Sequence, residues 1–238
     1  MQNETGNNVG SSNDTTKLEA EVRSAVAQGD NVQETVQHLT LAAMSAQIHD
    51  LASLRRIMTA VMQGAREGAQ QKLQQTTAQA HTARTQLTDA VAGLDAALAQ
   101  LAEASKLAVE EATGRAQKFS HEELARSRAD LESLETLFLE TLQVSASAAK
   151  GLVADTLHDL VAHAKRNGTA VGTQLKDTLT TFTQQMTSVS HAQLEAGVQL
   201  THATADLLRK IAAGVLSGLA ERVKPGDKPK DNSCSGRH

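Results

Sequence analysis

The chain has 238 residues with a net charge of -4, 40% hydrophobic residues and 21% charged residues. This balance is typical of a soluble protein rather than a disordered or membrane protein, and it argues against nonspecific nucleic-acid binding. With three Phe, no Tyr and no Trp, the composition predicts no deep ligand pocket, because large aromatic residues dominate most binding pockets, and no small-molecule substrate is evident.

The N-terminal part reads as a tail followed by two short helices. Residues 1–16 (MQNETGNNVGSSNDTT) have almost no apolar content, so we expect a disordered tail without a secretory signal. Short helices are predicted over 17–49, with Gly29 ending the first of them because glycine readily adopts the left-handed conformation found at helix ends. Asp50 is expected to cap the helix that follows.

The segment 50–223 is predicted to form a bundle of long helices, because its helical periodicity barely stops and both prolines lie beyond it. We expect three helices of roughly 45 residues or more, each extending about 70 Å. Asn167 and Gly168 form the strongest internal stop, and residues 224–238 are expected to be a disordered Pro/Lys/Ser tail. The predicted fold is all-α, an elongated antiparallel helical bundle or coiled coil.

Two apolar seams with alternating steps of four and three residues indicate helix packing of the coiled-coil type. The first seam comprises Leu87, Val91, Leu94, Leu98 and Leu101. The second seam begins at Phe182 and leads into the most apolar helical stretch, KIAAGVLSGLAERVK at 210–224. The predicted interaction residues from these two stretches are Phe182, Met186, Val189, Leu200, Leu207, Ile211, Val215, Leu216 and Leu219.

Charge is missing from part of the last predicted helix. No Asp, Glu, Lys or Arg lies between Asp177 and Glu195, and the same holds for Leu73 to Ala83. An exposed coiled-coil helix usually carries Glu and Lys at its flanking positions. Either these stretches face one another or another subunit, where desolvation penalises charge, or they form a weakly amphipathic face for a lipid, polymer or partner helix.

The apolar run from Ile211 to Ala220 cannot cross a membrane. Its ten residues extend about 15 Å as a helix, against a hydrocarbon core of about 30 Å. Two interpretations stay open: docking within the bundle or between subunits, and transient insertion into a surface. Glycines four residues apart, such as Gly64 and Gly68, allow close helix approach but are weak evidence in an Ala-rich chain.

No chemistry is evident in the residues. The cluster Asp155, His158, Asp159 and His163 is the best metal candidate, but no Glu-x-x-His or second Asp-x-x-His completes it. We therefore expect a solvated face, with no metal and no cofactor. No GxGxxG, GxxxxGK[ST], GxSxG, HExxH or CxxC motif occurs. The single cysteine, Cys234, has nothing to activate it, so we expect a protein that is not an enzyme.

Two resemblances follow. The stretches EASKLAVEEATGRAQKFSHEEL, LESLETLFLETL and HAKRNGTAVGTQL, over roughly 103–175, resemble an uncharacterised family of helical proteins from proteobacteria. In overall composition the chain is similar to the phasins, which coat polyhydroxyalkanoate granules, although it is longer than many of them and more acidic at its centre. The likeness to phasins implies no catalytic residue and a role at a granule surface.

Two functions are therefore expected in the cytoplasm, where a lone cysteine needs no disulfide partner. In the first, the protein is a phasin-like interaction protein whose amphipathic faces coat a hydrophobic granule or lipid surface or bind partner helices. In the second, it is a self-associating coiled-coil scaffold with no surface-binding role. Self-association is expected in either case.

Overall fold

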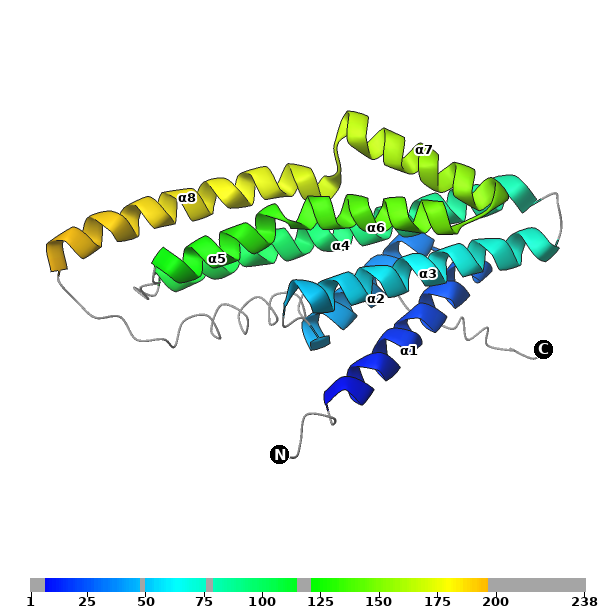
Figure 1. Ribbon diagram of the computed structural model, residues 1–238, viewed down its shortest axis with the longest axis horizontal. Helices are drawn as coiled ribbons and strands as arrows, with labels where there is room; N and C mark the ends of the chain where they lie inside the picture. The colour runs from blue at the N-terminus through cyan, green and yellow to red at the C-terminus, as the bar shows by residue number, and fades with distance from the viewer. Residues whose placement is uncertain (1–6, 48–49, 76–78, 115–120, 197–238) are drawn as a thin grey trace, which may run out of the picture.

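The computed structural model describes residues 7–47, 50–75, 79–114 and 121–196. Within these ranges the chain is all-α, as predicted, and it folds into an elongated bundle (Figure 1). The helices are α1 (Asn7–Gln28), α2 (Val32–Gln47), α3 (Leu51–Gln75), α4 (Ala80–Gly114), α5 (His121–Glu132), α6 (Leu134–Ala148), α7 (Gly151–Asn167) and α8 (Ala170–Ala196).

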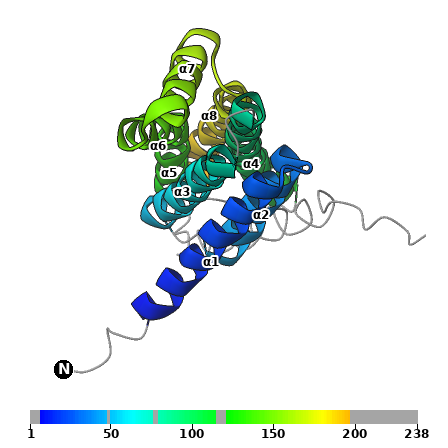
Figure 2. The same ribbon diagram turned by 90° about the vertical axis from the view of Figure 1, so that its right-hand side faces the viewer.

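The chain reverses between α1 and α2 and again before α3, so α1 lies parallel to α3. Arg23 of α1 forms an ion pair with Glu67 of α3 at 3.1 Å. One turn further along both helices, Lys72 donates a hydrogen bond to the carbonyl of Ala27 at 2.9 Å. Figure 2 shows α1 lying at an angle to the long helices, with its N-terminal end projecting from the bundle.

Two glycines allow α1 and α3 to pack with their backbones almost in contact. A Cβ atom on Gly64 would lie 2.4 Å from the carbonyl oxygen of Glu19, and one on Gly68 would lie 2.7 Å from that of Arg23. Gly93 of α4 packs in the same way against the carbonyl of Gln33 in α2, at 2.5 Å. These three glycines therefore set how closely the helices approach one another here.

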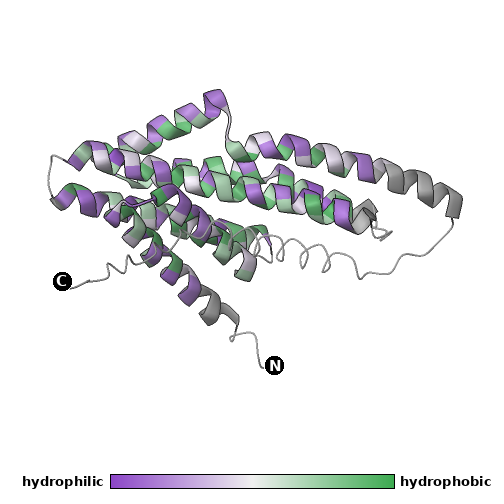
Figure 3. Cartoon of the chain, turned by 180° about the vertical axis from the view of Figure 1, so that it is seen from behind, coloured by the Kyte–Doolittle hydropathy of each residue, from purple (hydrophilic) through white to green (hydrophobic). Residues whose placement is uncertain are grey.

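The first predicted seam lies at the centre of the bundle. All five of its residues, from Leu87 to Leu101, are buried, and α4 packs against α2, α3, α7 and α8 of the same chain. Figure 3 shows hydrophobic residues gathered where helices face one another. The seam is therefore covered by helices of its own chain, which supply the apolar partners that the heptad pattern demands.

Three predicted helix boundaries are confirmed. Gly29 and Gly168 adopt φ values of +88° and +81°. Their amides donate to the carbonyls of Ala25 and Ala164, each at 2.9 Å. Asp50 caps α3, because its Oδ1 accepts a hydrogen bond from the Ser53 amide at 2.7 Å.

The prediction of three helices of roughly 45 residues is wrong for the first two, which are divided, while the third is described only as far as Ala196. α3 ends at Gln75 and α4 begins at Ala80, inside the uncharged stretch that was expected to continue a helix. A second break separates α6 from α7, where Gly151 has a φ of +57°. Neither break contains proline. Gln75 and Ala80, which flank the first break, are compatible with helix, so tertiary packing decides where α3 ends. At the second break, Gly151 permits the left-handed conformation.

α1 begins earlier than expected. It starts at Asn7, so residues 7–16 are helical although the sequence predicts a disordered tail over 1–16. Once Leu18, Val22 and Val26 are buried, each further residue adds a backbone hydrogen bond without a new nucleation cost. The remainder of that tail, and the whole of 224–238, lie outside the described residues.

Candidate interaction surfaces

Beyond Asp177, the exposed residues of α8 whose side chains the structure describes carry no charge. They are Thr180, Thr183, Gln184 and Thr187, which we call the α8 face. The three threonine hydroxyls donate to the carbonyls of Lys176, Leu179 and Thr183, at 2.8, 2.8 and 3.0 Å. Their hydrogens are thus used inside the helix, so the three threonines present methyl groups and uncharged oxygen atoms, and Gln184 adds an uncharged amide group.

Burial within the chain explains only part of the uncharged stretch. Thr178 and Phe182 are buried against the bundle, and Thr178 donates to the carbonyl of Ala102 at 3.1 Å. The α8 face, in contrast, is exposed, so no packing in the described residues requires it to lack charge.

Of the predicted interaction residues, the structure places only Phe182. This side chain belongs to the core and is 1% exposed, so it packs inside the chain rather than at a free surface. Met186 and Val189 lie in α8, but their side chains are outside the described residues. The same holds for Leu200, Leu207, Ile211, Val215, Leu216 and Leu219, which are outside the described part of the chain altogether.

A carboxylate from another helix fixes the start of α8. Asp95 of α4 accepts hydrogen bonds from the amides of Ala170 and Val171, at 2.7 and 2.9 Å. Thr169 accepts one from the amide of Gly172 at 2.9 Å and donates its own hydroxyl hydrogen to Glu135 of α6 at 2.8 Å. The first amides of α8 therefore find acceptors that tie α4, α6 and α8 together.

Burial raises the pKa of the Asp95 carboxyl above its ordinary value. The two amide hydrogen bonds from α8 favour the charged form and act in the opposite direction, while the nearby Glu135 carboxylate raises the pKa further. Sequence reasoning missed this cap, because nothing in the heptad around Asp95 shows that a helix 75 residues later begins there.

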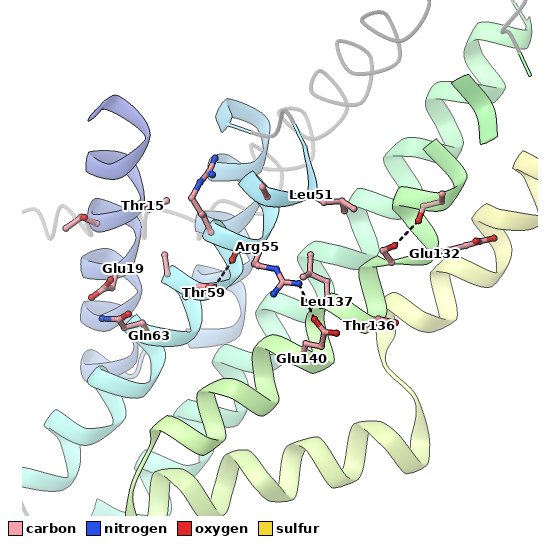
Figure 4. A pocket seen from close by; sticks show the side chains of 16 residues that line it. Thr15, Glu19, Leu51, Arg55, Thr59, Gln63, Glu132, Thr136, Leu137 and Glu140 are labelled. Carbon is pink, nitrogen blue, oxygen red and sulfur yellow. Dashed lines mark hydrogen bonds and ion pairs between the residues drawn. The ribbon is translucent and has the colours of Figure 1, made fainter. Parts of the chain in front are cut away.

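A groove of about 1150 Å³ opens between α1, α3 and the α5–α6 segment (Figure 4). We call it the α1–α3–α6 groove. Apolar lining comes from Leu51, Ala52, Ala60, Ala129 and Leu137, and the charged lining residues are Glu19, Arg55, Arg56, Glu132 and Glu140. Arg55 crosses from α3 to pair with Glu140 of α6 at 3.1 Å.

The predicted candidate metal cluster lies on the solvent side of α7. Asp155, His158, Asp159 and His163 are all exposed. His158 bonds to the carbonyl of Ala154 at 2.8 Å, and His163 bonds to the side-chain Nδ2 of Asn167 at 2.9 Å, so both rings bond within their own helix. In the described ranges, no group of three or more metal-ligating side chains comes together.

None of the helices in the described ranges is both long enough and apolar enough to cross a membrane. No curated protein and no solved structure matches the chain. A family model does match, over residues 8–225, and its description is a family of unknown function (DUF6781). That match spans nearly every described helix and most of the C-terminal segment, so the chain belongs to this family of unknown function.

Proposed function

We propose that this protein is a non-catalytic helical interaction protein that coats a hydrophobic granule or lipid surface. The α8 face carries the proposal, because it is exposed and uncharged in a chain where 21% of residues are charged. Threonine is a mediocre helix former, whereas Glu and Lys at these positions would add helix stability and favourable side-chain pairs. The composition of this face therefore lowers the stability of the helix, and a binding role would explain why these residues are present.

The chemistry of the α8 face suits contact with an apolar surface. Charged side chains would have to be desolvated there, at a cost of several kcal/mol. Thr180, Thr183 and Thr187 avoid that cost, because their hydroxyl hydrogens already bond to backbone carbonyls of the same helix. Their methyl groups can thus meet a lipid or polymer without breaking a hydrogen bond. The likeness in composition to phasins supports the same function.

The test is flotation of the full chain with neutral phospholipid vesicles and with polyhydroxybutyrate particles. Thr183→Glu should reduce the bound fraction at least fivefold. Thr85→Glu is the matched control, since Thr85 is also exposed and donates to a carbonyl four residues earlier, at 3.1 Å, yet it lies on α4. Its binding should equal that of the unmodified chain.

Two results would contradict the proposal. The unmodified protein could stay in the soluble fraction with both particles, or the two variants could bind equally well. If Thr183→Glu instead lowers the mass found by sedimentation equilibrium without changing flotation, the α8 face is a contact between copies. The self-associating scaffold would then replace the coat.

A further inference from the structure

The α1–α3–α6 groove has the form of a site for one more helix. Three helical walls enclose it, and Leu51, Ala60 and Leu137 contribute apolar lining. The rim has three carboxylates, Glu19, Glu132 and Glu140, against two guanidinium groups, Arg55 and Arg56, so its formal charge is -1. An amphipathic helix with basic ends would match both properties.

A segment of the same chain, outside the described residues, has the sequence pattern of such a helix. We propose that the segment 209–223 docks in the α1–α3–α6 groove of its own chain. Its apolar run is bracketed by Arg209 and Lys210 before and Arg222 after, with Glu221 as its one acid. The formal charge of the segment is therefore +2, opposite in sign to the groove rim. An attached segment also binds at a high effective concentration, which favours it over a second copy.

The length of the chain permits this docking and constrains it. Glu135, which bonds to Thr169 at the start of α8, directly precedes the groove residue Thr136. The 27 residues of α8 carry the chain about 40 Å away from that point. The 12 residues from 197 to 208 can span about 40 Å when extended. The connecting stretch therefore reaches the groove again in an extended form, with little slack.

Cross-linking in the full chain tests the docking. In a Cys234→Ser background, Ser217→Cys places a thiol within the segment and Thr59→Cys places one in the groove, where Thr59 is exposed and shown in Figure 4. A short bis-maleimide should join this pair within one chain at least tenfold faster than it joins Ser217→Cys to Thr85→Cys. Thr85 is a fair comparison because it is exposed and outside the groove.

Two further variants sharpen the result. Leu216→Asp should slow the Thr59 reaction to the control rate, whereas Leu216→Met should leave it fast, because only the first puts a charge on the apolar side. Deleting residues 199–203 should also abolish the fast reaction, since the shortened connection can no longer reach. Equal rates at both sites, or a fast reaction that survives the deletion, would overturn the proposal. Cross-links that join only separate chains would assign the groove to a second copy.

This docking concerns the free protein and does not depend on the proposed surface-binding function. Flotation through the α8 face can fail while the cross-link forms, and the cross-link can fail while flotation is intact. The two experiments therefore separate the two proposals.

Discussion

At the scale of single residues, Asp95 shows how one side chain determines where a helix distant in sequence begins. Its carboxylate caps the first two amides of α8 from another helix. The same burial that makes the cap rigid disfavours the negative charge and raises the pKa of the carboxyl. A helix start that depends on a partly buried acid is therefore sensitive both to removal of the side chain and to pH.

Replacing Asp95 tests the cap. Asp95→Ala should lower the free energy of unfolding by about 1–3 kcal/mol, since two amides lose their acceptors in a partly buried place. Urea unfolding followed by circular dichroism measures this difference. Ser147→Ala on the exposed side of α6, whose hydroxyl bonds only within its own helix, is the control and should change stability by a few tenths of a kcal/mol. Equal effects of the two changes would rule out a capping role for Asp95.

The pH dependence of Asp95 has a definite sign. Because the pKa of Asp95 is higher in the folded protein than its ordinary value of 3.8, the folded state holds this proton more tightly than the unfolded state. The stability from this group is present below that ordinary value and is lost as pH rises through the raised pKa. Asn cannot titrate, so the free energy of unfolding of wild type minus that of Asp95→Asn should fall as pH rises from 3.8 through the raised pKa. A flat or rising difference would contradict the assignment.

At the scale of helices, sequence signals worked where the cause is local. Gly29, Gly168 and Asp50 mark boundaries through the conformation or hydrogen bond of a single residue, so the sequence predicts them correctly. The end of α3 at Gln75 and the start of α4 at Ala80 have no comparable residue, since Gln and Ala are both compatible with a continuing helix. The cap by Asp95 and the α1–α3–α6 groove arise from helices distant in sequence, which no local pattern specifies.

The glycine contact between α1 and α3 gives a prediction opposite to ordinary helix propensity. Gly→Ala normally stabilises a helix by about 1 kcal/mol. At Gly64 the added Cβ would lie 2.4 Å from a backbone carbonyl, so α1 must move, and Gly64→Ala should destabilise by about 1–3 kcal/mol. Ala162→Gly on the exposed side of α7 measures the intrinsic propensity in this protein. A stabilising Gly64→Ala would show that α1 does not pack closely on α3.

At the scale of the whole molecule, α4 is the helix that joins the parts of the bundle. It packs against α2 and α3, which precede it in the chain, and against α7 and α8, which follow it. α1, in contrast, packs mainly on α3. This arrangement makes the core a continuous unit around α4, with α1 attached at its side (Figure 1).

Hydrogen exchange should reveal this hierarchy. Leu98 lies in α4 and is fully buried, so Leu98→Ala should cost about 2–5 kcal/mol and leave a cavity at the junction of the helices. Because the helices before and after α4 both pack on it, mass spectrometry should find that this variant has lower amide protection than wild type in α2 and in α8 together. Val26→Ala, also at a fully buried residue but on α1, should reduce protection mainly in α1 and its contact on α3. If Leu98→Ala lowered amide protection in only one of α2 and α8, the bundle would consist of two independently stable parts. If Val26→Ala lowered protection in α8 as much as in α1, α1 would belong to the same cooperative unit as α4.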